Sequence, residues 1–413
     1  MADKKKLSLP TRIMLGLILG ILVGIFFTGE SGFFSPNTLN TWIRPFGTVF
    51  LRLLTFVIIP VVFFSLVNGI LQLKDVSKLG AIGGKIMIFY LITTICALAI
   101  GFLVSFAFKG FYPVLQTTGL EYTPRQVDIT TTLIELFPGN IISPFATNAM
   151  IPLIMVAIAI GLSILAVGEK AAAFAKLIEA GNEVFMKIML FIVGLSPYGV
   201  FALISATTAT NGPQIFTGFA VVIGGAYIAY ILHMAITYGI ALRAFGGMSP
   251  IKFFKEMTPA MVMAFSSASS LASLGINMEC AKKLGVREPI VDFGLPLGAN
   301  LNSDGTAIYQ ALAAVFIASC YGIDLTMGQM LMITFTATAA SFGIAGVPGA
   351  GMIMLGLVLG SVGLPIEGIA LIAGIDRIFD MGRTTLNVVG DVVGVIVVDN
   401  IEMKKEARQT PGN

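Results

Sequence analysis

The polar residues near the C-terminus lie in a segment that is otherwise apolar enough for a membrane. Residues 375–398 place six polar side chains at helical spacing: Asp376, Asp380, Arg383, Thr384, Asn387 and Asp391. At 100° per residue, a helix brings all six within roughly a quarter turn. A charge at bilayer depth costs at least about 2.5–3.5 kcal/mol, so such residues usually face a protein interior and mark a substrate or ion path. The stripe therefore predicts a site that holds both cations and an anionic group.

A second polar segment interrupts the apolar run at residues 298–310. Asn302, Asp304 and Thr306 offer hard oxygens around Gly305, which allows a helix to unwind. Unwound carbonyl groups and such side chains are the ligands that a desolvated Na⁺ requires. A helix-ending turn at a loop is the alternative, but the segment lies deep within an apolar span. We interpret it as part of a cation site.

Two further segments, 255–285 and 326–363, have small or polar centres and do not read as simple spans. Each predicts two short helices that meet at a tip, a re-entrant hairpin, because irregular backbone at membrane depth needs protein or a water-filled cavity around it. The serine-rich tip at 266–273 could bind a carboxylate or be a plain linker. The glycines of 343–351 could form a turn, which Val347-Pro348 favours, or serve helix packing.

Each predicted hairpin precedes a helix with an internal polar break, the first at 298–310 and the second in the C-terminal stripe. Paired interrupted segments are typical of an inverted repeat around a central binding site.

Two side chains have alternative roles. Arg383 presents a planar fork that suits a carboxylate ligand, or it neutralises Asp376 or Asp380 within the stripe. Both roles hold if ligand binding releases the internal pair. His233 is the only histidine and lies in an apolar run with aromatic neighbours, so a packing role is a simpler interpretation than a proton relay.

The composition is that of a polytopic membrane protein. Of 413 residues, 56% are hydrophobic and 11% charged, whereas a soluble domain is about one quarter charged. The net charge of +3 does not suggest a nucleic-acid partner. Basic residues precede the first apolar run and follow the last, which places both termini in the cytoplasm. Eight crossings are expected, at about 12–28, 43–72, 81–110, 130–168, 171–208, 215–243, 290–320 and 368–399.

Four motifs, in this order and spacing, resemble the dicarboxylate/amino acid:cation symporter family, which includes the excitatory amino-acid transporters and archaeal aspartate transporters. The motifs are the serine-rich tip, Asn302–Thr306, Gly346–Gly351 and Asp380–Asp391. The resemblance covers nearly the whole chain and is strongest over 255–399. It implies an all-α polytopic membrane protein with eight transmembrane helices, two re-entrant helical hairpins and inverted repeats.

The resemblance also implies a homotrimer in the cell membrane that works as an elevator. Residues 1–78 and 125–208 would form a scaffold of transmembrane helices one, two, four and five. Residues 79–112 would supply helix three, and 213–402 would supply helices six to eight and both hairpins, to a transport domain that slides across the lipid bilayer. The second hairpin would be the extracellular gate.

The site residues follow from the same resemblance. Arg383 would bind the side-chain carboxylate of the substrate and Asp380 its ammonium group. The implied substrate residues are Ser269, Ser270, Thr306, Val347, Gly351, Asp380, Arg383, Thr384 and Asn387. One Na⁺ would use Gly298, Asn302, Asn387 and Asp391; a second would use carbonyls of Asn300, Ser303, Ser341, Phe342 and Ile344; a third would use Tyr90, Thr93, Thr94, Asn302 and Asp304.

Some positions depart from the family pattern. Ser303 stands where members often carry Met, at a position that links the ion sites to the substrate site. Ala268 stands where archaeal relatives carry an arginine, and Arg377 could supply that charge as in other branches. Leu271 replaces a serine of the tip. Gln310 replaces a glutamate tied to proton and K⁺ coupling in animal transporters, which argues against that coupling here.

The sequence thus predicts a secondary active symporter, not an enzyme, that carries aspartate or glutamate inward with Na⁺. A cation- or proton-coupled C4-dicarboxylate carrier is the alternative, and Asp380 as an ammonium partner argues against it. An ion channel is a further alternative, since the family can leak anions. An intramembrane protease would need a catalytic aspartate pair or a serine–base dyad, and the sequence indicates neither arrangement.

Overall fold

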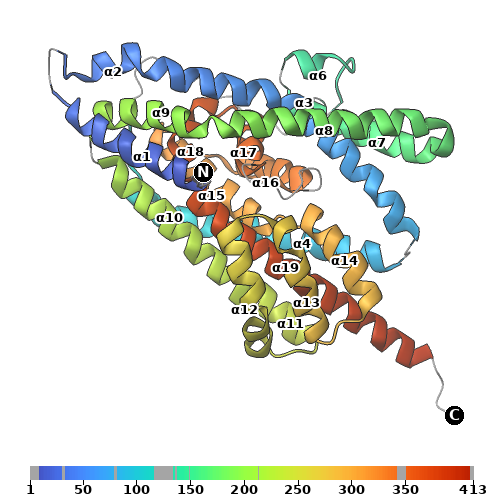
Figure 1. The fold of residues 1–413 in the computed structure, drawn as a ribbon. Helices are drawn as coiled ribbons and strands as arrows, with labels where there is room; N and C mark the ends of the chain where they lie inside the picture. Colours follow the sequence, from blue (N-terminus) through green and yellow to red (C-terminus); the bar gives the residue numbers. More distant parts are fainter. Residues whose placement is uncertain are drawn as a thin grey trace, which may run out of the picture.

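The computed structural model describes residues 9–29, 33–78, 81–115, 134, 137–147, 149–212, 214–341 and 350–409. Within these ranges the regular structure is entirely helical, without a strand (Figure 1). The prediction of an all-α protein is confirmed. In the described ranges the helices form two layers, with four short helices, α16, α17, η4 and α18, between them.

The first layer is built around α3, which packs against α7, α8 and α9, while α1 lies along α9. It occupies the upper half of Figure 1. Its core contains Val57, Val61, Leu153 and Met189, all buried. The helices of this layer are α1 (Leu9–Phe26), α2 (Pro36–Trp42), α3 (Arg44–Lys78), α6 (Ser143–Ala146), α7 (Met150–Val167), η2 (Gly168–Ala171), α8 (Ala172–Gly194) and α9 (Ser196–Asn211).

The second layer surrounds α15 and α19. Every residue of α15 is buried, and 89% of the apolar stretch of α19 is buried, against 33–56% in the other four long apolar stretches. These two helices are therefore the centre of the layer. Its helices are α4 (Ala81–Phe108), η1 (Lys109–Phe111), α10 (Gln214–His233), η3 (Met234–Tyr238, a π-helix), α11 (Gly239–Ala244), α12 (Pro250–Ser267), α13 (Ser270–Lys283), α14 (Glu288–Leu301), α15 (Asp304–Cys320) and α19 (Asp376–Gln409).

Short helices connect the layers: α16 (Met327–Ser341), α17 (Ala350–Ser361), η4 (Ile366–Gly368) and α18 (Ile369–Ala373). The two faces of α17 pack on different cores. Ile353 and Leu357 join the core of the first layer, whereas Met352 and Leu355 join that of the second. The boundary between the layers is thus apolar on both sides of α17.

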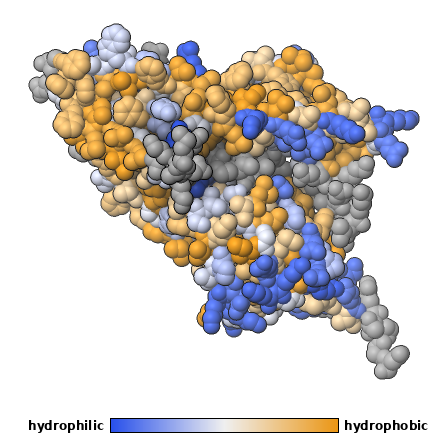
Figure 2. Space-filling model, viewed as in Figure 1, coloured by the Kyte–Doolittle hydropathy of each residue, from blue (hydrophilic) through white to orange (hydrophobic). Residues whose placement is uncertain are grey.

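The surface is suited to a lipid bilayer. Five helical stretches among the described residues are long and apolar enough to cross one: Arg44–Leu71, Ile82–Phe111, Pro152–Gly194, Phe216–Ala244 and Asp376–Ala407. Figure 2 shows apolar side chains over most of one face, while hydrophilic side chains gather at the lower end, over α12 and α13. Large apolar side chains left exposed in this way need a lipid or protein partner.

Two predicted helix interruptions are present. Ala268, with φ 48° and ψ 44°, separates α12 from α13, and the two helices pack against each other as predicted for 255–285. Ser269 caps α13 by accepting a hydrogen bond from the Ala272 N–H at 3.3 Å. α14 ends at Leu301 and α15 begins at Asp304, as predicted for 298–310. The tip of the second predicted hairpin, at 342–349, lies outside the described residues.

Two expectations about helix interruptions were wrong. The extended backbone lies at Asn302, with φ −83° and ψ 117°, and not at Gly305, which is already helical. The C-terminal stripe is not interrupted, because α19 runs as one helix from Asp376 to Gln409. The polar side chains of the stripe form hydrogen bonds with groups beside the helix. The backbone carbonyls of α19 can therefore all keep their hydrogen bonds within the helix.

Candidate functional site

The centre of the candidate site is a buried ion cluster on α19. Arg383 donates from Nε to Oδ1 of Asp380 at 2.9 Å and from Nη1 to Oδ1 of Asp376 at 3.1 Å. Its guanidinium carbon lies 4.8 Å from the centroid of the Tyr309 ring on α15, in cation–π geometry. All three ionic side chains are buried, so the prediction that the stripe faces the protein interior is confirmed.

Of the two roles considered for Arg383, the structure shows the internal pair. The guanidinium is shared between two carboxylates, which gives the cluster one positive and two negative formal charges. A carboxylate ligand would have to compete with Asp376 and Asp380 for the donors of Arg383. Once displaced, either aspartate could accept hydrogen bonds from an ammonium group.

A second arginine joins this cluster to the α12–α13 turn. Arg377 donates from Nη2 to the carbonyl oxygen of Ser267 at 3.1 Å, and its Nη1 lies 3.5 Å from Oδ2 of Asp380. The guanidinium therefore reaches the turn at Ala268, as expected if Arg377 supplies the charge that Ala268 cannot. Ser270 is buried beside this turn and Ser269 is half-buried.

Two glycines allow backbone to approach Arg383. A Cβ on Gly351, in the first turn of α17, would overlap the guanidinium of Arg383. A Cβ on Gly305, in the first turn of α15, would overlap the backbone of Arg383 itself. The first turns of α15 and α17 thus meet at the same side chain, and any other residue at either glycine would force them apart.

The other predicted substrate residues are distributed as follows. Thr306 and Thr384 are buried, on α15 and α19. Asn387 accepts a hydrogen bond from the Gly305 N–H at 2.8 Å through Oδ1. Val347 lies outside the described residues, as do two predicted cation ligands, Phe342 and Ile344.

A second polar group surrounds Asp391, which lies on α19 one turn after Asn387. The Nδ2 of Asn302 donates to Oδ1 of Asp391 at 3.0 Å and to the carbonyl oxygen of Asn387 at 2.8 Å. The Oδ1 of Asn302 is buried and has no hydrogen-bond partner. A Cβ on Gly298 would overlap Oδ1 of Asp391 and the hydroxyl of Tyr90, so the Gly298 backbone also reaches this point.

Asp304 lies in a third polar group and is fully buried. Its Oδ1 accepts from the Thr94 hydroxyl at 2.8 Å, and its Oδ2 accepts from the Tyr238 hydroxyl at 2.8 Å. Nε2 of His233 lies 3.2 Å from the same Oδ2. Thr94 was predicted to share a site with Asp304, and the structure brings the two together.

His233 is the buried, satisfied histidine that the sequence predicted, since it packs against Tyr238 and its Nε2 contacts Asp304. The sequence interpretation missed its partner, and Tyr238 was not among the candidate ligands. The π-helix Met234–Tyr238 brings the rings of His233 and Tyr238 to a centroid distance of 4.7 Å. The signal in the sequence was a pair of polar side chains in an apolar run, five residues apart. That spacing does not share a face in a regular α-helix.

Several predicted cation ligands use their side chains locally. Thr93 donates to the carbonyl of Tyr90 at 3.2 Å, Asn300 to that of Pro296 at 2.9 Å, and Ser341 to that of Ala337 at 2.8 Å. Ser303 is buried directly before α15. Ser303, Asn300 and Ser341 were predicted to act through backbone carbonyls, so these side-chain bonds leave their predicted ligand atoms unaffected.

The donor set around Asp304 and Asp391 suits a hard cation. It consists of carboxylate, amide, hydroxyl and backbone oxygens, and the unpartnered Asn302 Oδ1 offers one more acceptor. Within the part of the chain that the structure describes, neither aspartate has an ion pair with lysine or arginine, and His233 is the one basic side chain in contact with Asp304. Two buried carboxylates without such partners must bind a cation or take up a proton.

Comparison with known proteins identifies relatives over almost the full chain. A model of the sodium:dicarboxylate symporter family matches residues 9–401. The chain is 35% identical to the proton/sodium-glutamate symport protein of Geobacillus stearothermophilus over 409 residues, 96% of this chain and 95% of that protein. It is 32% identical to the proton/glutamate-aspartate symporter of Escherichia coli (98% and 95% covered) and 30% identical to a C4-dicarboxylate transport protein of Deinococcus radiodurans (96% and 89% covered).

Proposed function

The chain belongs to the sodium:dicarboxylate symporter family, and on this premise we propose that it carries aspartate or glutamate across the cell membrane together with Na⁺. As a symporter with several apolar helices, it is a multi-pass membrane protein and not an enzyme. The relatives named for glutamate and aspartate support the choice of an acidic amino acid as substrate.

One observation carries the ion assignment: Asp304 and Asp391 are buried in a set of oxygen ligands without a lysine or arginine partner in the described residues. Na⁺ would be bound by the carboxylates of Asp304 and Asp391, the side chains of Asn302 and Thr94, and the hydroxyl of Tyr90. Each ion would supply the charge that the fold leaves uncompensated. The ions are cargo, so their release on the other side of the membrane must restore this uncompensated state.

Substrate binding is proposed to exchange one set of ion pairs for another. The side-chain carboxylate of the amino acid would take the donors of Arg383 that now serve Asp376 and Asp380. The ammonium group would then pair with Asp380, and Thr306 would lie near the side-chain carboxylate. Asn387 and the Ser270 backbone, assisted by Thr384, would hold the main-chain carboxylate, with Ser269 next to Ser270 at the start of α13. Gly351 would close over the ligand from α17.

Coupling between ion and substrate is proposed to pass through the break between α14 and α15. Asn302 is bonded to Asp391 and to the Asn387 carbonyl, while the Asn387 side chain is bonded to Gly305, which touches the Arg383 backbone. A cation that fixes Asn302 and Asp391 therefore also fixes the turn that supports Arg383. By linkage, substrate must raise Na⁺ affinity by the same factor by which Na⁺ raises substrate affinity.

We further propose the architecture that the resemblance implies: eight crossings with cytoplasmic termini, two re-entrant hairpins, a homotrimer and an elevator movement. The first layer would be the scaffold (1–78 and 125–208). The second layer together with α16, α17 and α18 would be the transport domain (79–112 and 213–402). The apolar contacts of α17 with both cores support a boundary that permits sliding, because few polar bonds would have to be broken.

The test is uptake of labelled aspartate by the purified protein in liposomes with an imposed Na⁺ gradient. We expect saturable uptake that requires Na⁺ and is inhibited by glutamate far more strongly than by succinate or fumarate. Strong inhibition by succinate would instead assign a C4-dicarboxylate carrier. Uptake driven by a proton gradient without Na⁺ would contradict the choice of coupling ion, and non-saturable flux would contradict a carrier.

A further inference from the structure

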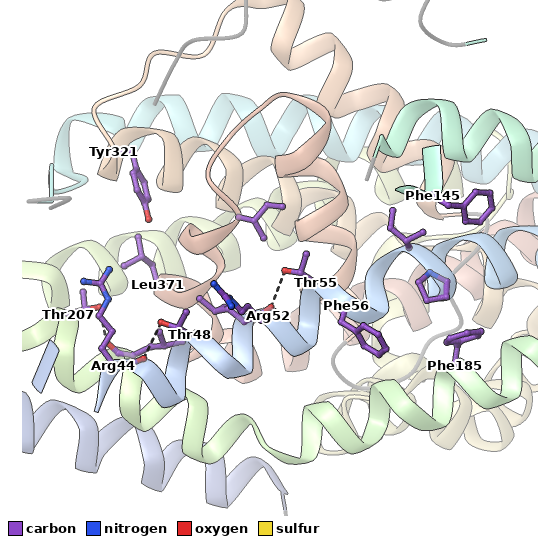
Figure 3. Close-up of a pocket in the computed structure, with 15 residues that line it drawn as sticks. Arg44, Thr48, Arg52, Thr55, Phe56, Phe145, Phe185, Thr207, Tyr321 and Leu371 are labelled. Carbon is purple, nitrogen blue, oxygen red and sulfur yellow. Dashed lines mark hydrogen bonds between the residues drawn. The ribbon is translucent and has the colours of Figure 1, made fainter. Parts of the chain in front are cut away.

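A cavity of about 910 Å³ lies on α3 at the boundary between the layers. The first layer contributes side chains from α3, α6, α8 and α9. The opposite wall comes from Tyr321 after α15, Ile366 in η4 and Leu371 in α18. Figure 3 shows Tyr321 and Leu371 on the side of the cavity that faces α3. None of the residues of the ion cluster or of the cation groups lines this cavity, so it is separate from the proposed transport site.

Two arginines of α3 line the cavity, Arg44 at one end and Arg52 near the middle, before the aromatic end (Figure 3). Arg44 is the first residue of α3, and Arg52 follows two turns later, about 12 Å along the helix axis. Both side chains are exposed, and neither forms an ion pair with an acidic residue in the described part of the chain. Arg52 lies inside the apolar stretch Arg44–Leu71, where an uncompensated guanidinium is costly unless an anion or water meets it.

The polarity of the cavity changes from one end to the other. Thr48 and Thr55 lie on the same helix as the arginines, and of the residues that the structure describes, no aspartate or glutamate lines the cavity. The opposite end is apolar and aromatic, with Phe56, Phe145 and Phe185, as Figure 3 shows at its right. A ligand that matches both ends has an anionic, hydrogen-bond-accepting head and a hydrocarbon tail.

We propose that this cavity binds an anionic phospholipid, with the phosphodiester on Arg44 and Arg52 and an acyl chain along Phe56, Phe145 and Phe185. Guanidinium groups bind phosphate oxygens through paired, charge-assisted hydrogen bonds. A free inorganic anion would leave the aromatic end unfilled, and a neutral lipid would leave the two arginines unpaired. The chemistry of the cavity therefore favours the phospholipid over both.

A lipid bound here would touch both layers at once. Its head would contact α3 while its surroundings include Tyr321, Ile366 and Leu371 of the other wall. Such a ligand stabilises the arrangement of the layers in which the cavity exists. It shifts the population of that arrangement only as far as it binds it more tightly than an arrangement without the cavity. Under the proposed elevator movement, an anionic phospholipid would therefore change how much of the protein occupies this arrangement.

The test is lipid retention by the purified, delipidated protein, measured by native mass spectrometry with dioleoylphosphatidylglycerol and dioleoylphosphatidylcholine as probes. We expect the wild-type chain to retain the anionic lipid preferentially. Arg44→Gln/Arg52→Gln should lower the affinity by about fivefold for each arginine removed. The matched control is Arg243→Gln, since Arg243 is an exposed helical arginine that does not line the cavity. It should leave retention unchanged.

Three results would overturn the proposal: equal retention of the anionic lipid by the double variant and the wild type, equal retention of both lipids by the wild type, and displacement of the lipid by millimolar inorganic phosphate. If the double variant does not fold, Arg44→Gln and Arg52→Gln are tested singly against the same outcomes. Retention is measured without aspartate or Na⁺, so a failure here is distinct from a failure of the proposed transport function.

Discussion

At the scale of the residue, Arg383 is the side chain on which substrate selection depends. It is buried, held by two carboxylates and an aromatic face, and approached by the backbone of two helices. This arrangement fixes the guanidinium before a ligand arrives, which lowers the entropic cost of binding, and a ligand carboxylate must then displace Asp376 and Asp380 from it. The same arrangement makes the residue hard to replace, since two aspartates depend on it.

We expect Arg383→Ala to lower aspartate affinity by roughly 30- to 5,000-fold, because loss of one partner from a buried, hydrogen-bonded charge pair costs about 2–5 kcal/mol. Na⁺ binding should persist, since Asp304 and Asp391 keep their oxygen partners. Isothermal titration with aspartate and with Na⁺ measures both. Arg243→Ala is the control for loss of an arginine as such, and unaltered aspartate affinity in the Arg383 variant would refute the role.

Asp304→Asn should weaken Na⁺ dependence, because it removes one of two buried carboxylates that lack a lysine or arginine partner within the described ranges. Half-saturation of aspartate binding by Na⁺ should move up at least about tenfold. Asp324→Asn is the control: the hydrogen bond from Lys109 lowers the pKa of Asp324, so this exposed carboxylate is ionised throughout a neutral assay. Its replacement removes the same formal charge outside the site. A Na⁺ dependence that is the same in both variants would exclude Asp304 as a ligand.

At the scale of the element, the break between α14 and α15 brings the cation groups and the ion cluster within one network. Asn302 and Asn387 join Asp391 to the first turn of α15, and Gly305 in that turn lies on the Arg383 backbone. A small displacement at Asp391 must therefore be transmitted to Arg383 and the reverse, because close-packed backbones do not deform continuously.

Gly305→Ala should disturb this contact, since its methyl group would overlap the Arg383 backbone. We expect a cost of about 1–3 kcal/mol in stability, as for other overpacked sites, and weaker coupling between Na⁺ and aspartate. Gly275→Ala on α13 is the matched control, because a Cβ there meets nothing within 4 Å and alanine favours a helix. Thermal unfolding with and without ligands compares the two. A Gly305 variant as stable and as strongly coupled as the control would contradict the close approach.

At the scale of the whole molecule, two layers share an apolar boundary at α17. The side of α17 that faces α3 brings Gly356 against Ile58, and the opposite side packs on α15. If the second layer moves past the first during transport, a covalent bridge at this boundary must stop it, whereas a bridge inside one layer must not.

We therefore expect that Ile58→Cys/Gly356→Cys, bridged by mercury in a background without Cys96, Cys280 and Cys320, abolishes aspartate uptake in liposomes and that thiol reductant restores it. The control bridge is Gly101→Cys/Ala311→Cys, which joins α4 to α15 within the second layer, where a Cβ on Gly101 would lie against the Ala311 Cβ. Full transport through the cross-layer bridge would contradict sliding of the layers.

The sequence determined the composition of the site, because helical periodicity and polarity are local properties. The buried stripe of α19, a helix interruption within 298–310 and a turn within the serine-rich tip could all be predicted from residues close together in the chain, although the extended residue is Asn302 and not Gly305. The family, and with it the list of candidate ligands, followed from motif order and spacing.

Only the tertiary structure decided which partners these residues take. Arg383 pairs with Asp376 and Asp380 and not with a distant group, and Asp304 receives Tyr238 and His233 from 66 and 71 residues away and Thr94 from 210. Such pairs depend on how the helices pack against each other, which the 3.6-residue period does not encode. They also depend on the π-helical turn after α10, which changes which residues share a face of the helix. The two-arginine cavity belongs to the same class, because α3 supplies its charge while the opposite wall comes from segments about 270 or more residues further along the chain.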